Sequence, residues 1–231
     1  MMGNGSKYQC LILLLLHHSS VSTPEKFEVL GPSEPVVAAV GEDVVLPCYV
    51  KPSMNAEALV VKWSRAGPTE PVILLQQKDA IRREDELAHY KDKINLFPEE
   101  LRRGNVSAKL SKVQTSDHGE YTCFVGSQDW FDLSLIRLAV QAVGTPPVVS
   151  RTTDGNGVFG LQCESKGWYP EPEVFWLDSD GNKLPAGPRE THRDKEGLFT
   201  VRHLVLTEKK SSNRFTCRVV QEQLHQTKET K

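Results

Sequence analysis

After the first 22 residues, the chain consists of short apolar runs that alternate with polar residues and are separated by clusters of Gly, Pro, Asn and Asp. Val44, Leu46 and Cys48, for example, share one side of an extended strand, because successive strand residues point to opposite faces. No run has the 3.6-residue period of a long helix. The pattern predicts an all-β fold built from β-sandwiches.

The pattern occurs twice, which predicts two tandem domains. Each half places a Cys on one strand, a Trp on the next and a second Cys on a later strand, with Trp63 in the first half and Trp176 in the second. Between the halves, the segment VGTPPVV (143–149) interrupts the alternation, and proline cannot donate to a sheet ladder. We therefore expect domains at residues 24–142 and 146–229, each large enough to bury its own core.

Residues 1–22 have the features of a secretory signal peptide. Lys7 precedes the apolar run CLILLLL, and small residues follow near Ser20 and Ser22. The run is too short to span a bilayer, and an uncleaved signal anchor is the alternative. Cleavage near Ser22 removes Cys10 and leaves four cysteines in an oxidising compartment, where three disulfide pairings are open to them.

No later segment has the twenty or so apolar residues of a membrane helix. The mature product is therefore expected to pass through the secretory pathway and be secreted. If the natural chain continues past Lys231 into a membrane helix, the product would instead lie on the external side of the plasma membrane. Contact with a membrane is expected only through such a segment, which this chain lacks.

The stretch SDHGEYTCFVG (116–126) resembles strand F of an immunoglobulin domain. In that fold, a Tyr two residues before the Cys closes a corner through its hydroxyl, and the Cys bonds to strand B across the sandwich. Tyr121 and Cys123 have this offset. The resemblance implies disulfides between Cys48 and Cys123 and between Cys163 and Cys217, with Trp63 packed beside the first.

The two cysteine separations imply different domain types. The first is 123 − 48 = 75 residues and resembles a variable-type domain, whereas the second is 217 − 163 = 54 and leaves no room for the extra strands C′ and C″. A variable-type domain should thus precede a constant-type one. Within the first, Lys93 occupies the place where variable domains have an Arg facing the Asp before strand F, here Asp117. We expect this pair to be a structural clasp that lacks the two-pronged contact of arginine.

Longer motifs resemble the butyrophilin and butyrophilin-like proteins, including the myelin oligodendrocyte glycoprotein branch. They are GEDVVLPC, VKWSR and FPEELRRGNVSAKLSKVQTSDHGEYTCFV in the first half, and CESKGWYPEPEVFWLDSDG and KEGLFTV in the second. The most specific is GWYPEP (167–172), in which we expect Trp168 and Tyr169 to form an exposed aromatic pair with a structural role.

The resemblance implies a binding protein with an immune-regulatory role. Its first domain would engage a protein receptor on T cells or other leukocytes through the sheet that holds strands C, C′, F and G, and would modulate T cell receptor signalling and cytokine production. Two alternatives stay open: homophilic adhesion by self-association of the same sheet, and a soluble decoy of a membrane-bound form.

Other function classes find little support in the residues. A net charge of −2 with interspersed signs gives no reason to expect nucleic acid as a partner. The histidines are scattered without the spacing of metal ligands, and no nucleophile stands with its base. We therefore expect neither catalysis nor a cofactor or metal.

Five residues define the candidate binding and modification sites. Asn105 opens the sequon Asn-Val-Ser at the expected start of strand E, where a glycan would shield that sheet and leave the opposite one free. On the opposite sheet, Lys62 and Phe124 should point outward because their neighbours point inward. Trp130 and Phe131 lie between strands F and G and are candidate contacts, although Phe131 could instead fold back into the core.

Overall fold

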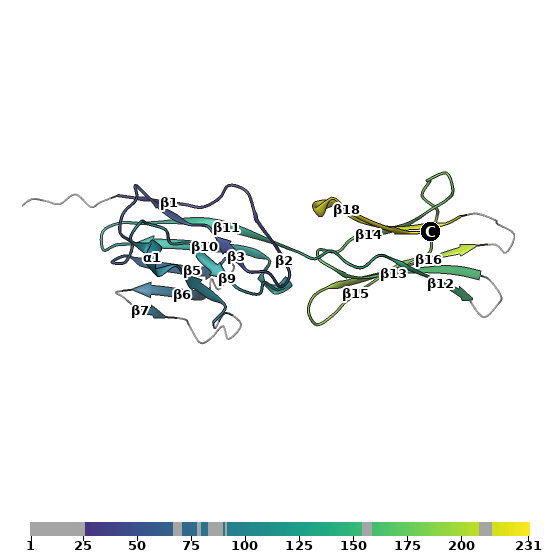
Figure 1. Ribbon diagram of the computed structural model, residues 1–231, viewed down its shortest axis with the longest axis horizontal. Coiled ribbons are helices and arrows are strands. Elements are labelled where there is room, and N and C mark those ends of the chain that lie inside the picture. Colours follow the sequence, from purple (N-terminus) through teal and green to yellow (C-terminus); the bar gives the residue numbers. More distant parts are fainter. Residues whose placement is uncertain are drawn as a thin grey trace, which may run out of the picture.

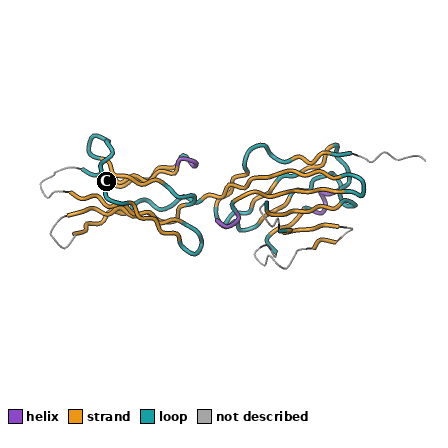
Figure 2. Tube along the Cα trace, turned by 180° about the vertical axis from the view of Figure 1, so that it is seen from behind, coloured by secondary structure: helices purple, strands orange, loops and turns teal. Residues whose placement is uncertain are grey.

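The computed structural model describes residues 26–66, 71–77, 80–82, 90, 92–153, 159–207 and 214–231. The predicted signal peptide and the first residues of the predicted first domain lie outside this part of the chain. Figure 1 shows two β-sandwiches arranged end to end, and the reverse view in Figure 2 shows that strands dominate both. The predicted fold class is confirmed.

The first domain packs a six-stranded sheet against a second layer. The order in the six-stranded sheet is β2 (Val36–Ala39), β11 (Phe131–Gln141), β10 (Gly119–Gly126), β5 (Val60–Arg65), β6 (Val72–Gln77) and β7 (Ala80–Arg82). The second layer holds β3 (Val44–Leu46), β9 (Ala108–Leu110) and β8 (Ile94–Leu96), together with the pair β1 (Glu28–Leu30) and β4 (Tyr49–Lys51). Only the pairing of β2 with β11 is parallel among these described strands. Strands β5, β6, β10 and β11 correspond to C, C′, F and G of a variable-type domain.

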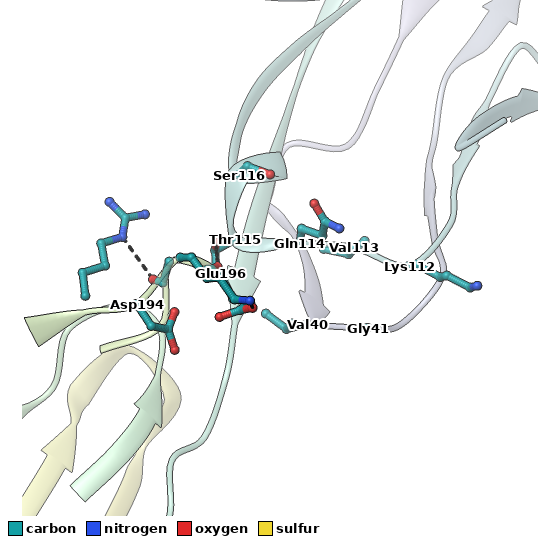
Figure 3. Close-up of a pocket in the computed structure, with 12 residues that line it drawn as sticks. Val40, Gly41, Lys112, Val113, Gln114, Thr115, Ser116, Asp194 and Glu196 are labelled. Atoms are coloured by element: carbon teal, nitrogen blue, oxygen red, sulfur yellow. Dashed lines mark hydrogen bonds and ion pairs between the residues drawn. The ribbon is translucent and has the colours of Figure 1, made fainter. Parts of the chain in front are cut away.

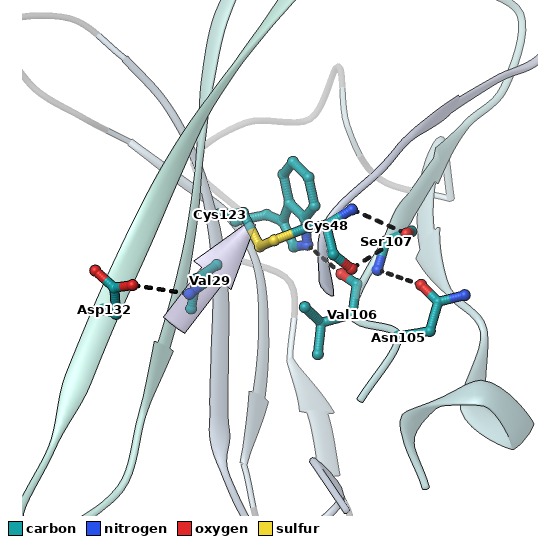
Figure 4. The surroundings of a disulfide bond; sticks show 8 residues. Val29, Cys48, Asn105, Val106, Ser107, Cys123 and Asp132 are labelled. Atoms are coloured by element: carbon teal, nitrogen blue, oxygen red, sulfur yellow. Dashed lines mark hydrogen bonds between the residues drawn. A yellow bond between two sulfur atoms is a disulfide. The ribbon is translucent and has the colours of Figure 1, made fainter. Parts of the chain in front are cut away.

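The core of the first domain is built around a disulfide between the two layers. Cys48 and Cys123 are bonded and fully buried, and Figure 4 shows the bond bridging the layers. The buried Trp63 donates its indole N–H to the Val106 carbonyl at 3.0 Å, so its polar atom is satisfied. The Tyr121 hydroxyl donates to the Asp117 carbonyl at 2.8 Å and closes the corner before β10. The helical segments here are short, α1 (Pro98–Leu101) and η2 (Thr115–Asp117).

The second domain is a smaller sandwich of constant type. One sheet has the order β12 (Val148–Thr153), β13 (Phe159–Trp168), β16 (Phe199–Thr207) and β15 (Arg189–Arg193). The other has β14 (Glu173–Leu177), β17 (Thr216–Gln221) and β18 (Gln226–Thr230), with η3 (Glu222–Leu224) between the last two. A disulfide joins Cys163 to Cys217, and Trp176 is buried beside it. Both disulfides are the pairs expected from the sequence.

Trp168 differs from the expectation of an exposed aromatic pair, because it is fully buried in the second core. Its indole N–H donates to the Ser165 hydroxyl at 2.7 Å. The pairing of β13 with β16 shifts register between Ser165 and Trp168, and Gly167 between them has φ +84°. This bulge moves Trp168 onto the same side of the strand as Cys163. Tyr169 is partly buried at the junction of the domains.

The junction is held by main-chain hydrogen bonds. Ala142 and Tyr169 exchange two of them, at 2.8 and 3.0 Å, and the Thr145 amide donates to the Lys166 carbonyl at 2.9 Å. In Figure 3 the loop at Thr115 meets the loop at Glu196, and the Thr115 hydroxyl donates to the Glu196 carbonyl at 2.5 Å. A hollow of about 630 Å³ lies between these loops.

His203 on β16 is expected to make the second domain less stable at acidic pH. Its Nε2 lies 3.0 Å from the Gly187 carbonyl, whereas its buried Nδ1 has no hydrogen-bond partner among the described residues. Burial, reinforced by the nearby charge of Arg189, lowers the pKa of the imidazole. The folded state therefore favours the neutral ring, and the stability that this ring contributes at neutral pH is lost as the pH falls through the lowered pKa.

The measurement is the melting temperature of the second domain between pH 7.5 and pH 5. We expect it to fall with pH, and we expect His203→Gln to flatten part of the slope. An identical slope in the variant would show that other groups control the pH dependence.

Candidate functional site

The outer surface of the six-stranded sheet carries a row of exposed apolar side chains on β11. Phe131, Leu133 and Leu135 are 64%, 47% and 54% exposed, while Ile136 and Leu138 further along the strand are buried in the core. Alternate residues of a strand face opposite ways, so the three exposed side chains lie on one side. Large apolar residues gathered on a solvent-facing strand mark a surface suited to a protein partner.

Neighbouring strands extend this row into a patch. Across the sheet, Leu133 lies opposite Phe124 on β10, and Phe124 lies opposite Lys62 on β5. The rings of Phe124 and Phe131 stack with centroids 5.6 Å apart, and the Lys62 ammonium lies 5.1 Å from the Phe124 centroid. We call Lys62, Phe124, Phe131, Leu133 and Leu135 the front face.

Gly126 gives the Phe124 ring room to lie over the sheet. A Cβ placed on Gly126 would come within 3.0 Å of the Phe124 ring. Beyond Leu135 the register pairs Arg137 with Glu120, and both are exposed. The front face is thus apolar at its centre and is bordered at one end by the charged residues Glu120 and Arg137, as expected of a protein–protein interface with a polar rim.

Trp130 is turned away from the front face. Its indole N–H donates to the Phe27 carbonyl at 2.8 Å, the Lys26 ammonium lies 5.0 Å from its ring, and its side chain packs against the core. The next residue but one, Asp132, accepts a hydrogen bond from the Val29 amide at 2.8 Å, as Figure 4 shows. Trp130 and Asp132 therefore fasten the start of the domain to β11.

Of the four candidate contact residues, the structure brings Lys62, Phe124 and Phe131 together and separates Trp130 from them. Phe131 does not fold back into the core, since it is the most exposed of the three apolar residues on β11. Sequence reasoning missed Leu133 and Leu135. The signal was present, because the segment 131–140 is apolar at both odd and even positions and so offers two apolar faces.

The clasp residues lie at the opposite end of β10 from Phe131. The Lys93 ammonium lies 2.5 Å from the Asp117 carboxylate, which also accepts the Gln114 amide at 2.7 Å. The Arg65 guanidinium donates to the hydroxyls of Tyr90 and Tyr121. Burial raises the pKa of both tyrosine hydroxyls, so they remain neutral hydrogen-bonding groups. This network supports the fold next to the domain junction.

Asn105 lies on the other layer of the sandwich, between α1 and β9. Its side-chain oxygen accepts the Ser107 amide at 3.1 Å, as Figure 4 shows. The sequon and the front face are therefore on opposite sides of the first domain.

Two further features bear on the class of site. Within the described ranges, no group of three or more His, Cys, Asp or Glu side chains is arranged to hold a metal ion. In the same part of the chain, no helix is long and apolar enough to cross a membrane.

Known proteins provide an independent comparison. A family model described as "Immunoglobulin V-set domain" matches residues 31–141, and one described as "Butyrophilin subfamily 3 member A2-like, Ig-C domain" matches residues 143–229. The crystal structure of bovine butyrophilin superposes with a TM-score of 0.78 at 34% identity, covering 88% of this chain and 96% of that chain. This chain belongs to the butyrophilin family.

Curated members of the butyrophilin family show how much of the family architecture is present. Human butyrophilin subfamily 1 member A1 is 35% identical over 209 residues, which are 90% of this chain and 40% of the relative. Human butyrophilin-like protein 2 is 30% identical over 217 residues, 94% of this chain and 44% of the relative. This butyrophilin-family chain thus spans about two fifths of the length of these relatives, and it comprises two immunoglobulin domains.

Proposed function

We propose that this chain is an immune-regulatory ligand whose first domain binds a protein receptor on T cells or other leukocytes and modulates T cell receptor signalling and cytokine production. The observation that carries the proposal is the front face, with three large apolar side chains exposed on a single strand. Monomeric proteins rarely expose such a patch unless it meets a partner.

The chemistry of the front face suits recognition of another protein. Phe124 and Phe131 offer large apolar area with few rotatable bonds, so their burial costs little side-chain entropy. The Lys62 ammonium lies over the Phe124 ring and adds a positive charge beside the apolar centre. A partner surface with apolar residues flanked by a carboxylate would complement this arrangement.

The second domain acts in this proposal as a spacer that positions the front face. The two sandwiches are arranged end to end, and their junction is fixed by main-chain hydrogen bonds. An extracellular location accords with the two disulfides, which persist in oxidising compartments.

A multimer of the chain, produced in secretory mammalian cells, tests the proposal by staining of resting and activated leukocytes. We expect saturable staining of T cells, because multivalency reveals weak single-site contacts. Leu133→Asp should reduce staining at least about tenfold, since a carboxylate would have to be desolvated at the centre of the interface.

Leu206→Asp is the matched control, because Leu206 is a similarly exposed leucine on a strand of the second domain. Both variants should keep the original melting temperature, since neither side chain is buried. Equal staining by the two variants would show that the front face does not contact the receptor.

Homophilic adhesion is the second candidate, and the pair formed by Arg137 and Glu120 favours it. Two front faces related by a two-fold axis would bury their apolar centres and could place each arginine near the partner copy's glutamate. Sedimentation of the chain over a range of concentrations distinguishes the candidates. Self-association that is lost in Leu133→Asp, with staining restricted to cells that express this chain, would make adhesion the function.

A further inference from the structure

The layer opposite the front face carries a second group of exposed apolar residues. Leu30 and Tyr49 are 44% and 43% exposed, and we call them the back patch. Leu30 lies directly opposite Tyr49 in the pairing of β1 with β4. Tyr49 in turn forms an antiparallel bridge with Asn105, so the back patch borders the sequon.

Asn105 and Tyr49 project from the same side of this layer. The neighbours of Tyr49, Cys48 and Val50, are both buried, so Tyr49 itself points to solvent. Directly opposed residues of an antiparallel pair have their Cβ atoms about 4.5–5.5 Å apart and their side chains on one face. A group attached to Asn105 would therefore emerge beside the Tyr49 ring.

The amide of Asn105 can carry an attached group in the folded domain. Its oxygen accepts the Ser107 amide, whereas none of the hydrogen bonds among the described residues uses its nitrogen. Asn105 is partly exposed, so the nitrogen lies at the surface.

Ser107, the third residue of the sequon, is closed off in the folded domain. Its side chain is buried, and its hydroxyl oxygen accepts the Cys48 amide at 3.0 Å while lying 3.3 Å from the Cys48 carbonyl. Because this hydroxyl is enclosed against Cys48 in the folded domain, attachment of a sugar belongs to a stage before the segments around Cys48 and Ser107 come together.

We propose that Asn105 carries an N-linked glycan whose first sugar lies against the Tyr49 ring and whose core covers Leu30. The C–H groups of a sugar ring suit the negative face of an aromatic ring, and the sugar hydroxyls stay in water. The back patch is thus closed by carbohydrate and not by a protein. The inference rests on the proposed function in one respect: a glycan on this layer leaves the front face free for the proposed receptor.

The attachment itself is a group transfer from a lipid-diphosphate oligosaccharide. A bond forms between Asn105 Nδ2 and the anomeric carbon of the first sugar, and the bond from that carbon to the diphosphate oxygen breaks. The diphosphate leaves with the bonding electron pair, and the amide nitrogen loses one proton.

The test compares one sequence in two forms, glycosylated from mammalian cells and unglycosylated after refolding from bacteria, each with and without Tyr49→Ala. We expect Tyr49→Ala to lower the melting temperature of the first domain by about 4 °C in the glycosylated form, from one lost aromatic contact. In the unglycosylated form the shift should be smaller, because only the cross-strand contact with Leu30 is lost there. Using the same Asn105 in both forms keeps the hydrogen bond to Ser107 intact.

Trimming the mammalian glycan to its first sugar provides a second readout, and it should preserve the effect of Tyr49→Ala. Equal shifts in the glycosylated and unglycosylated forms would overturn the contact with Tyr49. A gel band that does not move after glycosidase treatment would overturn the glycan itself. Neither readout involves leukocyte staining, so failure here is distinct from failure of the receptor proposal.

Discussion

Replacing Asp117 with alanine is expected to lower the free energy of unfolding of the first domain by about 3–5 kcal/mol. The carboxylate is fully buried against Lys93, whose ammonium is itself almost enclosed. The substitution would remove the buried carboxylate that faces this cation and accepts the Gln114 amide. Urea denaturation of the chain, followed through the transition of the first domain, measures the loss.

Two control variants test whether the loss of stability comes from the buried position of the Asp117 carboxylate. Lys93→Arg keeps the positive charge and should change the unfolding free energy by less than about 1 kcal/mol, because a guanidinium also binds a carboxylate. Glu57→Ala removes a carboxylate whose partner, Arg102, is largely exposed, so it should destabilise the domain far less than Asp117→Ala. If Asp117→Ala were no more harmful than Glu57→Ala, the clasp would have no special role in stability.

The second large effect is expected at Gly144, where the linker passes over the second domain. A Cβ at this position would come within 2.3 Å of the Trp168 indole nitrogen and 2.5 Å of the Lys166 carbonyl oxygen. Gly144→Ala therefore forces either the buried indole or the linker to move. We expect the second domain to lose about 1–3 kcal/mol of stability, as in other overpacked cores.

The exposed neighbour Val143 provides the control for Gly144. Val143→Ala leaves the approach of the linker unchanged and should alter stability by less than about 0.5 kcal/mol. Small-angle scattering of the Gly144→Ala chain would report any change in the angle between the domains. Unaltered unfolding of the second domain would mean that the linker relaxes without cost.

The alternation of side chains between the two faces of a strand explains which features could be predicted from the sequence. Trp63 and Cys123 face inward and Lys62 and Phe124 face outward, as strict alternation requires. The same rule fails at Trp168, because the bulge at Gly167 adds one residue to the strand and exchanges its two sides. A bulge depends on the pairing of two strands, so the alternation within one strand does not reveal it.

The orientation of Trp130 lay beyond the sequence, whereas for Leu133 the sequence shows two apolar sides of the strand but not which of them is covered. Trp130 is placed by the carbonyl of Phe27, a partner 103 residues away along the chain. Leu133 belongs to a strand that is apolar on both sides, and only the stacking of the sheets decides which side is covered. Alternation shows that two residues share a face but not what that face meets.

The length of β11 has a mechanical consequence for the molecule. This strand of 11 residues begins in the front face and ends immediately before Ala142. The main chain of Ala142 is hydrogen-bonded to that of Tyr169 in the second domain. Tension between a bound receptor and the second domain would therefore run along a single strand of about 35 Å. Its last four residues pair in parallel with β2, from Leu138 opposite Val36 to Gln141 opposite Ala39. Such a load would shear these hydrogen bonds together and could not open them one at a time. The strand that carries part of the front face is therefore also the strand along which the load would run.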